Sequence, residues 1–187
     1  MFWDHHALEK EKSFIVVLVS FPSAYFYEKG DASDVFIKEI CMTVRKHLKN
    51  SLIVLKLKPH NNPNVNRWVY EAIKSLGDSK IIMNNTPAPF LAEKASLVFM
   101  VSDTTACFDF LIREVPCIEH CRYSKGWLNV YPRGSWWRDV GVKRTTNVDE
   151  LEQAIVKVKN GTFEVMRRDA LINTIKHKEN NEFFKTL

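Results

Sequence analysis

Apolar residues along the chain fall into short continuous runs that are separated by longer segments with a helical repeat. The runs are rich in Ile, Val, Leu, Phe and Met, and each is short enough for a single strand. A run without polar interruptions is typical of a strand that is covered on both faces. We therefore predict buried strands at Phe14–Ser20, Leu52–Leu57, Lys80–Met83, Leu97–Val101 and Pro116–Glu119.

The segments between these runs place apolar residues three or four positions apart, as helices that cover one face of a sheet do. The last long segment of this kind begins with Asn147 and Glu150, which resemble a capping box. The predicted helices are Asp34–Leu48, Pro63–Gly77, Pro89–Ala95, Thr104 to Glu114, Asn147–Asn160 and a final one from about Phe163.

Strands that alternate with helices predict a parallel sheet built with right-handed crossovers. Val140–Arg144 is expected to be its last strand. The fold class is therefore α/β, a Rossmann-like doubly wound parallel sheet with flanking helices. We expect one domain over residues 1–187, with an irregular N-terminus at 1–12 and a C-terminal helix within 161–187 that packs at the edge.

The composition agrees with one folded domain. The chain has 187 residues, of which 45% are hydrophobic, and a net charge of +5, so disorder and a nucleic-acid-binding excess of charge are both disfavoured. No apolar run approaches the roughly 18–20 residues of a membrane span, and no secretory signal is visible. The four cysteines are too few for a disulfide scaffold and lie mostly in apolar surroundings. We expect a cytoplasmic protein with buried thiols.

Ligands of doubly wound sheets bind outside the carboxyl ends of the strands, so the loops that follow strands carry the candidate chemistry. In the loop SDTTACFD, from Ser102 to Asp109, small hydroxylated residues join a strand to a helix. Free backbone N–H groups and the hydroxyls of Thr104 and Thr105 would suit a phosphate, and Asp109 would lie on the same helix face. Ordinary N-capping of the helix explains the same residues.

Two further loops contain cationic residues. Lys58 and His60 follow the second strand, where both would suit a phosphate, although KPH before NNPN is also a plain turn. The loop from Tyr123 to Arg138 combines aromatic rings with cations, and we select Arg133 from it. Those rings would stack on a ligand or anchor the loop to neighbouring helices.

Other site motifs are missing from the sequence. There is no P-loop, no GxGxxG and no GxSxG, which argues against a standard NTPase, dehydrogenase or α/β-hydrolase. Cys117, His120 and Cys121 lack a second ligand pair at metal spacing, so we expect no metal. Nucleic-acid binding is not expected, because the basic residues are scattered.

KPH followed by a strand and then SDTTACFDFLIREVPCIEH resembles the C-terminal, nucleotide-binding half of GT-B-type transferases. The resemblance is to the CDP-glycerol glycerophosphotransferase and capsule-polysaccharide families. It implies that His60, Thr104 and Thr105 hold the donor pyrophosphate, with His60 as the catalytic group. Asp109 would lie beside the ribose or beside the phosphate-binding hydroxyls. Lys58 is added on charge grounds, and Arg133 resembles an Arg-Gly of the same pattern.

The resemblance implies a transferase of surface-polysaccharide biosynthesis that needs no cofactor and uses a CDP-, CMP- or UDP-linked donor as substrate. A full GT-B enzyme has two such domains, so we expect an acceptor domain or partner subunit in addition to this chain. It also implies peripheral contact with the inner face of the membrane. The alternatives are a non-catalytic nucleotide- or sugar-binding module and a nucleotide-sugar 2-epimerase-like protein.

Overall fold

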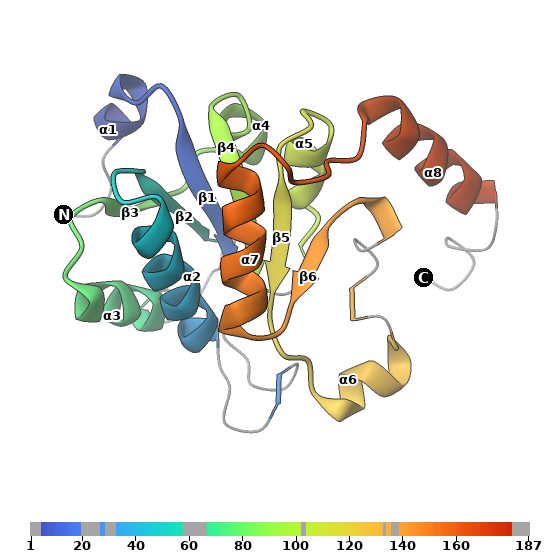
Figure 1. Cartoon of the computed structure of the whole chain (residues 1–187), viewed down its shortest axis with the longest axis horizontal. Coiled ribbons are helices and arrows are strands. Elements are labelled where there is room, and N and C mark those ends of the chain that lie inside the picture. The colour runs from blue at the N-terminus through green and yellow to red at the C-terminus, as the bar shows by residue number, and fades with distance from the viewer. Residues whose placement is uncertain are drawn as a thin grey trace.

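A six-stranded parallel sheet forms the centre of the protein (Figure 1). The computed structural model describes residues 5–19, 27–28, 33–57, 67–101, 104–132, 134–135 and 139–180. The strands follow the order β3-β2-β1-β4-β5-β6, and every neighbouring pair is parallel. Their bounds are β1 Phe14–Val19, β2 Ile53–Leu57, β3 Ile81–Asn84, β4 Ala95–Val101, β5 Cys117–His120 and β6 Lys143–Thr145.

This strand order is that of the doubly wound Rossmann fold, so the predicted fold class is confirmed. The five apolar runs all form strands, with ends that differ from the prediction by one or two residues. The sixth strand begins at Lys143 rather than at Val140, because Asp139 and Val140 form a turn of 3-10 helix and Gly141 has a positive φ of 92°.

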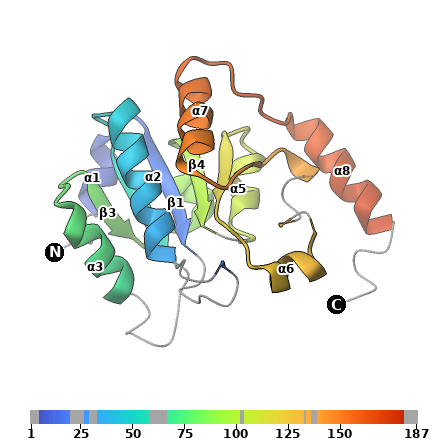
Figure 2. The ribbon, with the colours of Figure 1, turned by 60° about the horizontal axis from the view of Figure 1, so that its bottom comes forward.

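Helices cover both faces of the sheet (Figures 1 and 2). The first core cluster lies between the sheet and α2 (Ser33–His47), α3 (Arg67–Leu76) and α7 (Val148–Lys159). The second lies on the other face, under α4 (Ala88–Leu91), α5 (Cys107–Leu111) and α8 (Arg168–Asn180). The result is a three-layer α/β/α sandwich.

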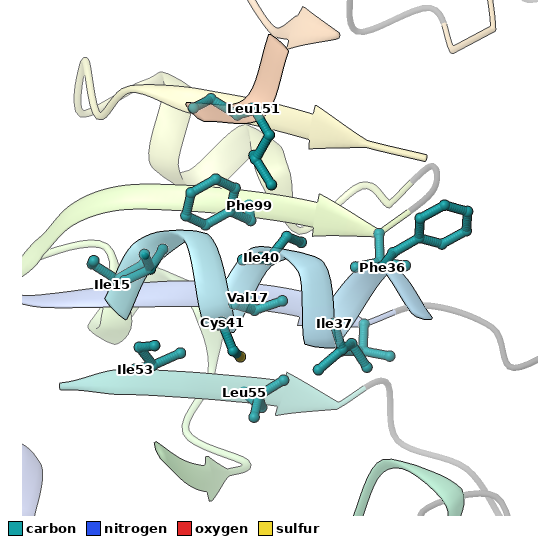
Figure 3. Close-up of a cluster of buried hydrophobic side chains, with 14 of the residues drawn as sticks. Ile15, Val17, Phe36, Ile37, Ile40, Cys41, Ile53, Leu55, Phe99 and Leu151 are labelled. Atoms are coloured by element: carbon teal, nitrogen blue, oxygen red, sulfur yellow. The ribbon is translucent and has the colours of Figure 1, made fainter. Parts of the chain in front are cut away.

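Helix α2 supplies the centre of the first core. Its residues Phe36, Ile37, Ile40 and Cys41 point at the sheet, where Figure 3 shows them above side chains of β1 and β2. Strand residues alternate between the two faces, so Ile53 and Leu55 join this core while Val54 joins the second. This alternation makes both faces of each central strand apolar.

The N-terminal end of α7 has the cap that the sequence predicts at Asn147 and Glu150. The side chain of Asn147 accepts a hydrogen bond from the N–H of Glu150 at 2.9 Å. The carboxylate of Glu150 accepts one from the N–H of Thr146 at 2.7 Å, so the reciprocal bond reaches one residue further back than in a standard capping box.

Several short helices differ from the prediction. Helix α1 (His5–Lys10) occupies part of the segment 1–12 that was expected to be irregular, and α6 (Lys125–Val130) lies within the expected aromatic loop. The side chain of Ser124 starts α6 by accepting a hydrogen bond from the N–H of Trp127. Local caps of this kind are weak signals in a sequence without strong apolar periodicity.

Two other helices end before their predicted ends, and the final helix begins after its predicted start. Helix α4 spans only Ala88–Leu91, because Ala95 already belongs to β4. Helix α5 ends at Leu111. Just after it, Glu114 adopts a positive φ of 56°, and the N–H of Val115 donates to the Phe110 carbonyl. The final helix, α8, begins at Arg168, and its Leu171 is buried in the second core.

The four cysteines are buried free thiols, as the sequence predicts. Within the described ranges, no helix has the length and apolarity that a membrane span needs.

Candidate functional site

The carboxyl ends of β1 and β4 form the switch point of the sheet. The two strands are neighbours, yet the chain continues from β1 to α2 on one face and from β4 to α5 on the other. In folds of this kind the divergence opens a crevice in which ligands bind. Of the predicted site residues, Thr104, Thr105 and Asp109 follow β4 and belong to the described part of the chain.

Thr104 and Thr105 lie between β4 and α5, as predicted. Thr105 is exposed and Thr104 is half-buried. The N-cap residue is Ala106, which has no side chain that caps the helix, so neither threonine serves as the N-cap. Their carbonyls accept hydrogen bonds from the N–H groups of Cys107 and Phe108 at 3.2 and 3.1 Å.

The short length of α5 weakens one part of the sequence argument. The helix has five residues instead of the expected eleven-residue segment from Thr104 to Glu114, and two of its first amides are already bonded. A helix of this length has a small dipole. Any anion at this loop would therefore depend mainly on side chains.

Asp109 is half-buried on α5 and faces a mixed electrostatic environment. Burial raises the pKa of its carboxyl, while the positive charges of Arg113 and Lys56 oppose that rise. Lys56 is on β2, and burial lowers the pKa of its ammonium against the opposing effect of Asp109. The structure thus brings Asp109 near a lysine that the sequence analysis did not select.

The remaining predicted residues, Lys58, His60 and Arg133, lie outside the described residues. Their roles stay predictions. The neighbours of Arg133 are described: Gly134 is buried with a φ of 88°, and the hydroxyl of Ser135 donates to Glu119 at 3.0 Å. Ser135 therefore ties this segment to the end of β5.

One polar row across the sheet was missed by sequence reasoning. Residues that pair across the sheet and face α4 and α5 form rows that run from strand to strand. One row is entirely apolar. The next row toward the carboxyl ends is polar on β3 and β2 and on β5 and β6. The apolar row is Ile82, Val54, Val16, Val98 and Cys117. The polar row, in strand order, is Asn84, Lys56, Leu18, Met100, Glu119 and Arg144.

Three polar members of this row lie within an apolar run or at its end. Lys56 stands within LIVLKL, Asn84 follows KIIM, and Glu119 ends PCIE. Charged residues are rarely buried unless they are paired, so a lysine inside such a run is the signal that could have identified the row.

Glu119 anchors one end of the polar row. It is 1% exposed, and its carboxylate accepts hydrogen bonds from the hydroxyls of Tyr123 and Ser135. The guanidinium of Arg144 lies over the Tyr123 ring at 5.1 Å from its centroid. Burial and the neighbouring Glu119 raise the pKa of Tyr123, so this phenol stays protonated and donates.

The opposite face has its own ionic cluster, between the end of β5 and the middle of α2. His120 is fully buried, with Nε2 at 2.7 Å from Glu39 and Nδ1 at 2.8 Å from Thr145. Arg122 donates to both carboxylate oxygens of Glu39 at 3.1 and 3.2 Å. These contacts are internal to the fold, and we assign them to holding α2 against β5.

Metal ligation finds no support in the described part of the chain, which has no group of three His, Cys, Asp or Glu side chains placed to bind an ion. Cys117 and Cys121 are buried, and the Cys117 thiol donates to the carbonyl of Val115.

No protein-family model matches the sequence, and no curated protein matches it. Solved structures with the same fold do exist. A protein assigned as a UDP-N-acetylglucosamine 2-epimerase from Listeria monocytogenes superposes with a TM-score of 0.58 at 14% identity, over 98% of this chain and 49% of that one. The chain has the fold of one half of a GT-B protein.

Two further structures of this kind are similar. The UDP-GlcNAc 2-epimerase of Methanocaldococcus jannaschii, in complex with UDP-GlcNAc and UDP, matches with a TM-score of 0.52 at 13% identity, over 92% of this chain and 48% of that one. Os79 from O. sativa, in complex with UDP, matches with a TM-score of 0.50 at 14% identity, over 91% and 37%. The chain spans half or less of the length of each.

Proposed function

We propose that this GT-B half binds a nucleotide-activated sugar or polyol phosphate and serves as the donor-binding domain of a transferase. One observation carries the proposal: near the carboxyl ends of the strands, polar side chains lie on the strands that flank the apolar pair Leu18 and Met100 at the switch point, where this fold binds ligands. The complexes with UDP and UDP-GlcNAc formed by proteins of the same fold support it.

In this proposal the chain holds the donor while an acceptor hydroxyl attacks it. The departing nucleotide gains negative charge on its phosphate, and groups that are already oriented toward that charge lower the barrier. Thr104 and Thr105 supply hydroxyls, and His60 and Lys58 are proposed to add donors from the loop after β2. Asp109 would accept hydrogen bonds from the ribose, and Arg133 would pair with a phosphate.

The acceptor side of the reaction is proposed to come from a second domain or a partner subunit, since GT-B sites lie between two domains. The net charge of +5 favours an anionic donor and an acceptor linked to an anionic membrane surface. Surface-polysaccharide biosynthesis, with a CDP-, CMP- or UDP-linked donor, is the process that fits the sequence resemblance.

A second candidate is a nucleotide-sugar 2-epimerase-like protein, which is favoured by the epimerases among the similar structures. An epimerase converts a free UDP-sugar without an acceptor, whereas a transferase releases nucleotide only when an acceptor is present. A non-catalytic nucleotide-binding module would bind the same ligands and do neither.

The test is calorimetric titration of the chain with CMP, CDP, UDP and GDP. We expect at least one to bind with a millimolar or lower Kd, and Thr104→Val to weaken that binding. Thr162→Val is the matched control, because Thr162 is exposed in the segment after α7 and far from the switch point along the sheet. A folded chain that binds none of the four nucleotides would contradict the proposal.

A further inference from the structure

Lys56 and Asn84 are direct neighbours on the face of α4 and α5. They are paired in the register of β2 and β3, one residue from the end of β2 and at the end of β3. Paired residues of parallel strands project to the same face, and the preceding pair on that face, Val54 and Ile82, lies in the second core. The two polar side chains therefore lie side by side, next to the apolar pair Val54 and Ile82.

Asn84 presents only a donor at this position. It is 0% exposed, and its Oδ1 accepts a hydrogen bond from the N–H of Thr86 at 2.6 Å. That bond fixes the orientation of the amide, since a reversed amide would set two donors against each other. Within the described residues, the other amide atom, Nδ2, is buried and has no partner. A buried donor without a partner destabilises the folded state.

Lys56 is likewise a donor without an acceptor. Its side chain is half-buried, and within the described part of the chain no ion pair or hydrogen bond holds its ammonium. Asp109 is near enough to act on its charge, yet the two groups form no ion pair. Desolvating a cation without a partner is unfavourable, so the fold gains nothing from a lysine here.

We propose that Lys56 and Asn84 form an anion subsite that binds a phosphate oxygen of the ligand, with Asp109 accepting a hydrogen bond from a sugar hydroxyl beside it. Two neighbouring groups that can only donate fit a partner that accepts, and the charge of Lys56 favours an anionic one. A carboxylate at Asp109 would repel a phosphate at close range but would accept from a hydroxyl. The subsite thus fits a phosphorylated sugar.

This inference rests on the proposed function, because it identifies which side chains contact the phosphate. It also departs from the sequence analysis, which placed the phosphate at Lys58, His60 and the threonine pair. Lys56 lies on a strand, so its position is fixed by the sheet and does not depend on the conformation of a loop.

The experiment compares Lys56→Met with Lys143→Met, which removes an exposed lysine from β6 at the other side of the sheet. Kd values are measured for the tightest-binding nucleotide, for its unphosphorylated nucleoside and for inorganic pyrophosphate. We expect Lys56→Met to weaken nucleotide and pyrophosphate binding at least tenfold and to leave nucleoside binding unchanged. Lys143→Met should leave all three unchanged.

Thermal unfolding of Lys56→Met separates a binding role from a structural one. Because methionine removes an unpaired, half-buried cation, the variant should be at least as stable as the wild type. A variant that is clearly less stable would assign Lys56 to the fold and overturn the inference.

Asn84→Asp provides a second variant that should fold. An aspartate oxygen can still accept from the N–H of Thr86, while the new charge neutralises Lys56. We expect it to reduce pyrophosphate binding as strongly as Lys56→Met does. Nucleotide binding that is unchanged in both variants would overturn the subsite and leave the proposed function intact. If the wild type binds pyrophosphate through Lys56 but binds no nucleotide, the subsite stands and the proposed function is overturned.

Discussion

Nε2 of His120 lies 2.7 Å from a carboxylate oxygen of Glu39, which joins strand β5 to helix α2 across the first core. Phe36, one turn earlier on α2, packs edge-on against the His120 ring at 5.9 Å between ring centroids. The guanidinium of Arg122 covers the same phenyl ring at 4.7 Å. The His120 ring is thus fully buried beside Phe36, while Glu39 and Arg122 remain partly exposed.

This arrangement predicts a loss of stability in acid. Burial by itself would raise the pKa of Glu39, but hydrogen bonds from His120 and Arg122 outweigh burial and lower it. A carboxyl whose pKa is lower in the folded state stabilises the fold above its unfolded pKa and loses that contribution as the pH falls through the folded value. We expect Glu39→Gln to be less stable at pH 7 by about 2 kcal/mol, as for the loss of hydrogen bonds to a charged group, and to lose less stability below pH ~4.5.

Urea unfolding from pH 3 to pH 8 measures both effects. Glu152→Gln is the control, because Glu152 also has a lowered pKa from its bond with Lys46 but lies on the surface, where such pairs contribute little. If the two variants had the same pH profile, the cluster at His120 would have no special role in acid stability.

The hydroxyl of Tyr123 is the subject of a second prediction. Tyr123→Phe removes a hydrogen bond to the buried Glu119 carboxylate and leaves it with fewer donors, so we expect a loss of about 1–3 kcal/mol in the free energy of unfolding. Tyr131→Phe, on an exposed residue that stacks on Trp127, should change stability by less than about 0.5 kcal/mol. Equal unfolding midpoints for the two variants would contradict this account of Glu119.

A third prediction concerns the backbone next to Arg133. Gly134 has a φ of 88°, and a Cβ there would lie 2.8 Å from Nη1 of Arg144. Gly134→Ala should therefore destabilise the protein by about 1–3 kcal/mol. Gly126→Ala, within α6 and with no atom closer than 3.9 Å to the new Cβ, should be neutral or stabilising by up to about 1 kcal/mol. Differential scanning calorimetry of the pair decides the point, since a reversed order would mean that Arg144 moves aside without cost.

The strands were predictable because continuous apolar runs have only one arrangement in which both faces are covered. The run from Phe14 is buried at every described position, and the capping residue Asn147 marked the start of α7 correctly. Both signals are local. A sequence shows local signals directly, and the parallel order of the strands followed from the crossover rule.

The candidate site was less predictable because its residues meet only through the register of the sheet. Nothing in the sequence shows that Lys56 lies opposite Asn84, since their pairing depends on how far β3 slides along β2. The predicted length of α5 is too great for a related reason. Ile112 and Arg113 continue a helical pattern in the sequence, but the left-handed conformation of Glu114 ends the helix. The sequence shows which residues are charged, but it does not show which residues lie beside them in the fold.

The central position of β1 has a consequence for how the protein is made. Strand β1 is synthesised before β4, so its second edge is covered only after β4 has been made, because Val19 pairs with Val101. At a translation rate of roughly 5–20 residues per second, that edge is left open for about ten seconds. During this interval the nascent chain exposes an apolar strand that can pair with other chains, so we expect folding at the ribosome to depend on chaperones more than refolding of the finished chain does.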